Sequence, residues 1–328
     1  MQIKALALIS GGLDSLLAAK LIAEQGCLVT GLHFKIPFCK LDIKKNFPDI
    51  GIKIMEVDLG REFLSLIQEP RYGFGANMNP CIDCKILMFS KAKELMAGLG
   101  ARFIITGEVL GQRPMSQNKQ ALKLIKEKSG LDDLLLRPLS AQFFPPSLAE
   151  KEGWVRREKL LDFNGRLRTP QMQLAKDLGL TEYANPAGGC LLTDPCFSKR
   201  LIELLAHKEL NLENLELLKV GRHFRIGNNA RLVVGRNEGE NKLLMQLACP
   251  GDYLFGPQED LAGPTCLARG RITQELISLS SEITSAYTDA DGLKEITVLY
   301  RQVLQPAVKD NLLKIPHLPK SRFAHLLI

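Results

Sequence analysis

The chain has 328 residues, of which 45% are hydrophobic and 24% are charged, and its formal net charge is +7. This is the composition of a soluble globular protein long enough for two domains, and the positive charge suits a polyanionic partner. No apolar run approaches the length of a membrane span, and residues 3–9 lack the features of a signal peptide. We therefore expect a cytoplasmic location and no membrane partner.

The first element along the chain is an apolar run at residues 5–9, which predicts a buried strand. Helical periodicity begins at residue 16, so the intervening segment lies on a strand-to-helix turn. Its glycines allow positive φ and a close approach to a ligand, and the N–H groups of the next helix favour an anion. Its aspartate is a hard ligand suited to the Mg²⁺ that a nucleotide carries. A turn that only joins two elements is the alternative, but the combination favours a nucleotide-binding loop formed by Ser10, Gly11, Gly12, Asp14 and Ser15.

Further apolar runs predict strands at residues 27–34, 52–57, 101–106 and 134–136. Helices are expected between them, at residues 61–68 and 81–99, with a basic loop containing Lys35, Lys40, Lys44 and Lys45. This alternation predicts an α/β fold with a doubly wound, mostly parallel sheet. Ligands of such sheets bind at the carboxyl ends of the strands. We therefore expect the nucleotide loop to be joined there by His33, Phe34, Thr106, Gly107 and Glu108.

The pattern of predicted helices and strands changes in the second half of the chain. Thr169 and Pro170 predict a helix start, with Thr169 as the cap, and a loop at residues 185–190 precedes a helix at 198–207. Beyond residue 211 the pattern predicts a smaller α+β domain. Its strands are expected at 217–225, 230–236 and 253–255, and its helices at 273–280 and 293–305. The predicted domains are therefore residues 1–210 and 211–328.

Eight cysteines are too few for a disulfide scaffold in a chain of this length, and in a reducing cytoplasm closely spaced cysteines more often bind metal or act in catalysis. Cys81 and Cys84 form a Cys-x-x-Cys at a helix start, a position that we expect to lower the pKa of the thiols. Cys190 lies in a glycine loop. Three thiolates fit an iron–sulfur cluster with one iron unligated by protein, and Cys196 as a fourth ligand would fit structural zinc. A redox dithiol and simple packing remain as alternatives.

Several of these motifs resemble those of one superfamily. The loop at Gly11–Ser15 resembles that of the ATP pyrophosphatase (PP-loop) superfamily, and the segments 106–117 and 136–139 resemble its tRNA 4-thiouridine synthetases. Asn79–Cys84 with the distant Cys190 is similar to the tRNA 2-thiouridine synthetases. The resemblance implies ATP and Mg²⁺ as cofactors, a catalytic role for Asp14, and a [4Fe-4S] cluster on Cys81, Cys84 and Cys190, which are then catalytic residues and metal ligands.

This resemblance predicts an ATP-dependent tRNA sulfurtransferase. The uridine carbonyl oxygen would be adenylylated with release of pyrophosphate, and sulfur from sulfide or from a cysteine desulfurase persulfide would then replace AMP. We expect 4-thiouridine, because segment 106–117 is at the end of the site where base and nucleotide bind. The alternatives are a 2-thiouridine synthetase, an amidotransferase-type synthetase of the same superfamily, and a non-catalytic RNA-binding protein that contains zinc.

The motif already begins at residue 10, so we expect RNA capture by the second domain. Its segments 220–225 and 234–241 resemble a small RNA-binding module of ribosome-quality-control proteins. The alternative is a solvated basic strand face. The candidate RNA-binding residues are Arg222, Arg225 and Arg236.

Overall fold

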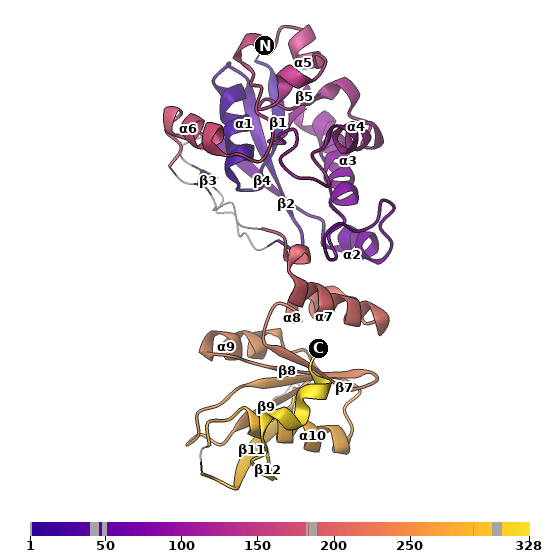
Figure 1. Cartoon of the computed structure of the whole chain (residues 1–328), viewed down its shortest axis with the longest axis vertical. Coiled ribbons are helices and arrows are strands. Elements are labelled where there is room, and N and C mark those ends of the chain that lie inside the picture. The colour runs from indigo at the N-terminus through magenta and orange to yellow at the C-terminus, as the bar shows by residue number, and fades with distance from the viewer. Residues whose placement is uncertain are drawn as a thin grey trace. The chain divides into compact units, whose positions relative to one another are not determined.

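The computed structural model describes residues 2–39, 46–47, 51–181, 183, 189–290, 292–303 and 310–328. Lys40, Lys44 and Lys45 of the predicted basic loop, residues 185–188 of the predicted glycine loop and the end of the predicted helix at 304–305 lie outside these residues. The chain divides into two compact units, Met1–Asp194 and Pro195–Ile328. Figure 1 shows both units, and each is described by itself.

The first unit is built on a six-stranded sheet in the order β3–β4–β2–β1–β5–β6. The strands are β1 (Lys4–Leu8), β2 (Leu28–Lys35), β3 (Asn46–Phe47), β4 (Ile52–Asp58), β5 (Phe103–Ile105) and β6 (Leu135–Leu136). All neighbours pair in parallel except β3, which is antiparallel to β4. The predicted doubly wound, mostly parallel sheet is therefore confirmed. Its strand order reverses between β1 and β5, the place where such sheets open a crevice for ligands.

Helices cover both faces of this sheet (Figure 1). They are α1 (Leu13–Ala23), α2 (Gly60–Gln68), α3 (Cys81–Leu99), α4 (Lys119–Lys128), α5 (Leu148–Lys151) and α6 (Thr169–Asp177). Short 3-10 turns occupy Asp132–Leu134, Ala141–Phe143, Arg157–Lys159 and Leu191–Thr193. Ala5 and Ala7 of β1 pack in one apolar core with Leu16 of α1, and Leu6 packs in a second core with Phe89 of α3. Burial on both faces explains why β1 is an uninterrupted apolar run rather than an alternating one.

The start of α6 corrects one detail of the sequence analysis. Arg168, and not Thr169, occupies the N-cap position, while Pro170 lies in the first turn as predicted. Proline already fixes φ near the helical value and lacks the N–H that a first turn leaves unpaired. The helix start therefore forms without a side-chain cap.

The second unit contains an antiparallel sheet in the order β12–β11–β9–β10–β8–β7. Its strands are β7 (Arg222–Gly227), β8 (Ala230–Val234), β9 (Tyr253–Pro257), β10 (Cys266–Gly270), β11 (Glu295–Gln302) and β12 (Asn311–Pro316). Its helices are α7 (Pro195–Ala206), α8 (Leu212–Leu217), α9 (Glu238–Leu247) and α10 (Gln274–Ala286), and a 3-10 turn spans Lys320–Leu326. Ile283 of α10 packs in one core and Leu244 of α9 in another, so the two helices cover opposite faces (Figure 1). The predicted α+β class is confirmed.

Two elements of this unit were predicted wrongly. Residues 295–302 form strand β11 and not part of a helix. Ile296 and Val298 lie on one face of this strand and are buried in the core, and its backbone pairs with β9 and β12. The expected strand at 217–225 begins only at Arg222, because Leu217 ends α8 and is buried. Across the described residues, no helix is both long and apolar enough to cross a membrane.

Candidate active site

The loop after β1 has the geometry of an anion-binding turn. Gly11 adopts a φ of 77°, which favours glycine, and Gly12 is the N-cap of α1 without any side-chain cap. The Ser15 hydroxyl donates to the Gly12 carbonyl at 2.7 Å and so closes the turn from within. The uncapped helix start is left as the natural place for a phosphate group.

Gly107 brings the end of β5 against this loop. A Cβ atom at Gly107 would lie 2.4 Å from the backbone carbonyl atoms of Asp14 and 2.5 Å from the backbone nitrogen of Ser15. No larger residue fits there without moving the backbone. The close approach confirms that these two segments, distant in sequence, meet at the carboxyl edge of the sheet.

A cavity of about 320 Å³ opens at this edge. Nine of the ten predicted ATP-binding residues line it: Ser10, Gly12, Asp14, Ser15, His33, Phe34, Thr106, Gly107 and Glu108. The tenth, Gly11, shapes the turn. The same cavity is lined by the three predicted cluster ligands, Cys81, Cys84 and Cys190. The structure therefore places the candidate nucleotide loop and the candidate thiol ligands around one space.

Asp14 carries a partly unsatisfied carboxylate into this cavity. Its Oδ2 accepts a hydrogen bond from Gln112 Nε2 at 3.1 Å, and Arg168 Nη2 lies 3.8 Å from its Oδ1. Oδ1 is buried and has no hydrogen-bond partner in the described part of the chain. Burial raises the pKa of Asp14 above its usual value, although Gln112 and Arg168 act in the opposite direction. A buried acceptor of this kind fits a cation such as Mg²⁺.

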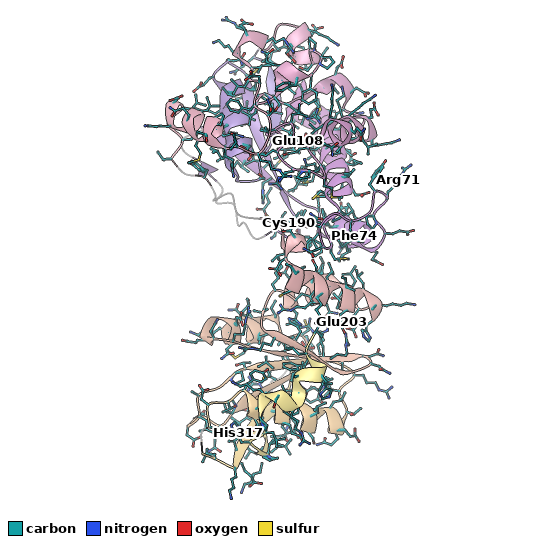
Figure 2. The ribbon with its side chains drawn as sticks, viewed as in Figure 1. Arg71, Phe74, Glu108, Cys190, Glu203 and His317 are labelled. Atoms are coloured by element: carbon teal, nitrogen blue, oxygen red, sulfur yellow. The ribbon has the colours of Figure 1, made fainter. Side chains whose placement is uncertain are left out.

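Glu108 is held from two sides and lies deep in the first unit (Figure 2). Lys85 Nζ donates to its Oε1 at 2.6 Å, and Arg137 Nε donates to its Oε2 at 2.8 Å. Burial alone would raise the pKa of Glu108, but these two cations outweigh it and hold the pKa below the usual value. The carboxylate therefore stays charged and fixes Lys85, the residue after Cys84, against the cavity wall.

His33 is buried at the end of β2, and its Nδ1 donates to the Ile9 carbonyl at 3.0 Å. This bond fixes the ring while it lines the cavity. The residue thus packs on the strand and also faces the candidate nucleotide space.

The three thiols have raised rather than lowered pKa values, which corrects the expectation from the helix start. Burial is the largest cause at Cys81, Cys84 and Cys190, and it raises the pKa of Cys190 to about 11. At Cys84 the neighbouring thiols Cys190 and Cys81 raise the pKa further. Desolvation of a thiolate therefore exceeds the stabilisation by the helix start, and a bound metal would reverse this balance.

A fourth thiol, Cys39, was missed in the sequence analysis. It pairs with Cys190 in an isolated antiparallel bridge, next to a hydrogen bond of 2.8 Å from Leu191 N–H to the Phe38 carbonyl. Cys39 also lines the cavity. The available signal was its position just beyond the predicted strand at 27–34, at the same sheet edge as the other candidates.

The chemistry of the donor set fits a soft metal centre, since thiols from two distant segments face one cavity. Among the side chains that the structure describes, no preassembled metal-binding group is found. Cys196, the possible fourth ligand for zinc, is exposed and belongs to the second unit.

The three arginines predicted to contact RNA lie in different environments. Arg225 forms a bidentate pair with Glu209, at 3.0 Å for both bonds, and also contacts Glu203 on α7, which Figure 2 labels. Arg236 pairs with Glu240. Arg222 instead lies over the ring of Tyr287, with 5.2 Å between its guanidinium carbon and the ring centroid, and Lys320 contacts the same ring at 5.2 Å.

Comparison with known families divides the chain in the same way. Residues 1–142 match the family described as "Thiamine biosynthesis protein (ThiI)". The first unit is therefore similar to this family. Residues 221–323 match the family described as "NFACT protein RNA binding domain". The predicted resemblance to PP-loop tRNA thiolation enzymes is therefore confirmed.

Individual relatives support both branches that the sequence motifs suggested. The tRNA-specific 2-thiouridylase MnmA of Marinobacter nauticus is 27% identical over 233 residues, which cover 65% of this chain and 57% of the relative. The probable tRNA sulfurtransferase of Methanothermobacter thermautotrophicus is 29% identical over 146 residues, which cover 42% of this chain and 36% of the relative. The chain thus spans less than two thirds of the length of either relative.

A solved structure is also similar to part of the chain. It is a 4-thiouridine synthetase–RNA complex with bound ATP, which is 21% identical and has a TM-score of 0.38. The match covers 65% of this chain and 52% of that one.

Proposed function

We propose that the protein is an ATP-dependent tRNA uridine sulfurtransferase that releases AMP and pyrophosphate. The observation that carries this proposal is the single cavity lined by both the nucleotide loop and three thiols. An activated carbon and an incoming sulfur must meet within bonding distance, and a shared cavity supplies this proximity. The ThiI-family match and the thiolating relatives support the same reaction.

The nucleotide loop would hold ATP. The start of α1 and the Ser10 hydroxyl would bind phosphate oxygens, Ser15 would hold the loop in shape through its bond to Gly12, and Asp14 would hold Mg²⁺ through its unpartnered Oδ1. Mg²⁺ supplies positive charge to the phosphates as negative charge develops on them. The uridine carbonyl oxygen attacks the α-phosphorus, and pyrophosphate leaves. The base must be splayed or flipped to reach the cavity.

The second step replaces the oxygen by sulfur. On the sulfide route, sulfide adds to the activated carbon and AMP leaves with the oxygen. On the route from the persulfide of a cysteine desulfurase, the terminal sulfur adds, AMP leaves with the oxygen, and a thiol must then attack the inner sulfur, which breaks the S–S bond and forms a disulfide. Cys81, Cys84 and Cys190 would hold a [4Fe-4S] cluster, which when bound supplies an iron site open to a sulfur ligand. Lys85, fixed by Glu108, adds a positive charge beside Cys84 that favours an anionic sulfur ligand.

We propose 4-thiouridine as the product rather than 2-thiouridine. Segment 106–117 borders the candidate nucleotide and base space, and Gly107 packs directly on the loop, which supports this choice. Nucleoside mass spectrometry of tRNA from a deletion strain decides between them. Loss of 2-thiouridine alone would replace this assignment by the MnmA-like one.

We also propose that residues 1–210 form the catalytic domain and residues 211–328 the RNA-binding domain of a cytoplasmic enzyme. The NFACT-type match supports the second assignment. Of the three candidate arginines, Arg222 is the one without a carboxylate within 4.0 Å among the described residues, so it is the best placed to contact RNA.

Alanine variants of the cysteines test the thiol part of this proposal. Anaerobically purified Cys81→Ala, Cys84→Ala and Cys190→Ala should each lose iron, acid-labile sulfide and thiolation, yet still bind ATP. Cys196→Ala is the matched control and should keep all four properties. Zinc that is lost in Cys196→Ala would instead indicate a structural zinc protein. A wild-type protein without metal would favour an amidotransferase-type synthetase.

A further inference from the structure

A second cavity, of about 370 Å³, lies entirely within the second unit. It is bounded by the segment after α7 and by the ends of β8 and β10. Its polar lining includes Lys208, Glu209, Asn214, Arg231, Arg269 and Arg271. None of these residues was singled out as an RNA contact from the sequence.

Arg231 is the most deeply buried of these cations, with 1% of its surface exposed. Its Nη2 donates to Glu203 Oε2 at 3.0 Å and to Glu209 Oε2 at 2.9 Å. Its Nε and Nη1 are buried and have no acceptor among the residues that the structure describes. Buried guanidinium donors are nearly always satisfied, so donors without an acceptor beside a polar cavity point to a ligand with acceptor atoms.

The charges around the cavity indicate the sign of that ligand. Glu203 and Glu209 balance Arg225 and Arg231, and Asp252 balances Arg269. The remaining two cations, Lys208 and Arg271, are exposed on the rim. Neither has a carboxylate within 4.0 Å in the described part of the chain.

These observations share one explanation. Two uncompensated cations at the rim and unsatisfied N–H donors at a buried arginine are the features of a site for a multivalent oxyanion. We propose that this cavity is a phosphate-binding site that takes a backbone phosphate of the RNA held by the second unit. The choice of RNA as the source of the phosphate rests on the proposed function, and a free phosphate compound is the other source.

Two double variants of the full chain test this site. Lys208→Gln with Arg271→Gln removes both rim cations. Lys294→Gln with Arg322→Gln removes the same charge from exposed positions of the same unit that do not line the cavity. Binding of inorganic phosphate is measured as the rise in melting temperature. Binding of a labelled tRNA transcript is measured by fluorescence anisotropy at several salt concentrations.

We expect the rim variant to lose at least half of the rise that phosphate causes in the control. Phosphate bound elsewhere, including at the loop of the first unit, affects both variants equally. For tRNA, we expect about tenfold weaker binding by the rim variant at low salt. The slope of log affinity against log salt should fall by about one for each phosphate group that the variant no longer binds.

Equal responses of the two variants to both probes would overturn the site. A phosphate response lost from the rim variant with unchanged tRNA binding would overturn the RNA assignment and identify a site for a free phosphate compound. A wild-type chain that binds no tRNA would contradict the proposed function, while the phosphate arm would still decide whether the cavity binds this anion.

Discussion

The two units use their buried charges differently. In the first unit, Asp14 keeps one oxygen without a partner at the edge of a parallel sheet, where the loops that follow separate strands converge. In the second unit, Glu203 and Glu209 on the chain before the sheet pair with Arg225 and with Nη2 of Arg231, so most of this charge stabilises the packing, and only Nε and Nη1 of Arg231 lack an acceptor among the described residues. An incompletely paired charge in a shared cavity is a better indication of ligand binding than the residue type alone.

This difference explains why the candidate residues of the first unit line one cavity, whereas the three candidate arginines of the second unit lie in different environments. The nucleotide loop is defined by backbone requirements, such as the positive φ of Gly11 and the missing side chain of Gly107, and few other structures impose them. An arginine in a strand has no such requirement. It serves equally well in an internal ion pair, as Arg225 does, or at a surface.

The largest effect is expected from Asp14→Asn. The variant removes the charge that would hold Mg²⁺, so pyrophosphate release in the presence of tRNA and ATP should fall by at least about a hundredfold. Because burial already disfavours the charged form of Asp14 and raises its pKa, the free energy of unfolding should not decrease. Asp132→Asn, on the surface, is the control. Unchanged turnover would remove Asp14 from the mechanism.

Oxidation should block the thiol end of the site completely but reversibly. Opposed residues in an antiparallel bridge have Cα atoms about 4.5–5.5 Å apart, within the range that a disulfide needs. Diamide should therefore link Cys39 to Cys190, release iron and stop thiolation, and dithiothreitol should reverse the link. Peptide mapping without reduction detects it, with Cys39→Ser as the control. A dominant link between Cys81 and Cys84 would contradict the expectation.

Much of the first unit follows from local sequence. The strands are apolar because both faces are covered, and α3 begins and ends at the predicted residues 81 and 99. α4 was not predicted, because its apolar face is short and its start depends on Asn118, whose side chain accepts from Ala121 N–H at 2.9 Å. The sequence could place candidates at strand ends, but it could not show that Glu108 is held between two cations.

Tertiary pairing decided the elements that sequence could not assign. Residues 295–302 have apolar positions compatible with a helix or a strand, and only pairing with β9 and β12 fixes the strand. The contact between Cys39 and Cys190 joins segments about 150 residues apart. No local pattern encodes such a pairing, which depends on how the loops close over the sheet.

A smaller, selective effect should separate Arg225 from Arg222. Arg225→Ala leaves Glu203 and Glu209 with Arg231 as the arginine between them. We expect the free energy of unfolding to fall by about 3 kcal/mol, with little change in the salt dependence of tRNA binding. Arg222→Ala loses a cation–π interaction worth about 0.5–1 kcal/mol but should lower the salt slope by about one. Chemical denaturation and anisotropy titrations measure the two effects. The reverse pattern would reassign the RNA contact to Arg225.

The smallest effect concerns pH and the interior of the second unit. His223 is buried, and its Nε2 donates to the Val220 carbonyl at 2.8 Å. Burial, reinforced by Arg200, Arg231 and Arg236, holds its pKa well below 6.5. The folded state therefore disfavours protonation of this ring.

The sign of the pH effect follows directly. Well above pH 6.5 His223 is neutral in both the folded and the unfolded chain, so it does not change the free energy of unfolding. As the pH falls below 6.5, the unfolded chain gains a proton that the folded chain does not, so the free energy of unfolding falls by up to about 1.4 kcal/mol per pH unit until the folded pKa is reached. Urea denaturation at pH 7.5, 6.5 and 5.5 measures this slope, and hydrogen exchange of the β7 amides at the same pH values measures it locally. His223→Gln should flatten it and His325→Gln, an exposed control, should not; equal slopes in both variants would show that other groups cause the effect.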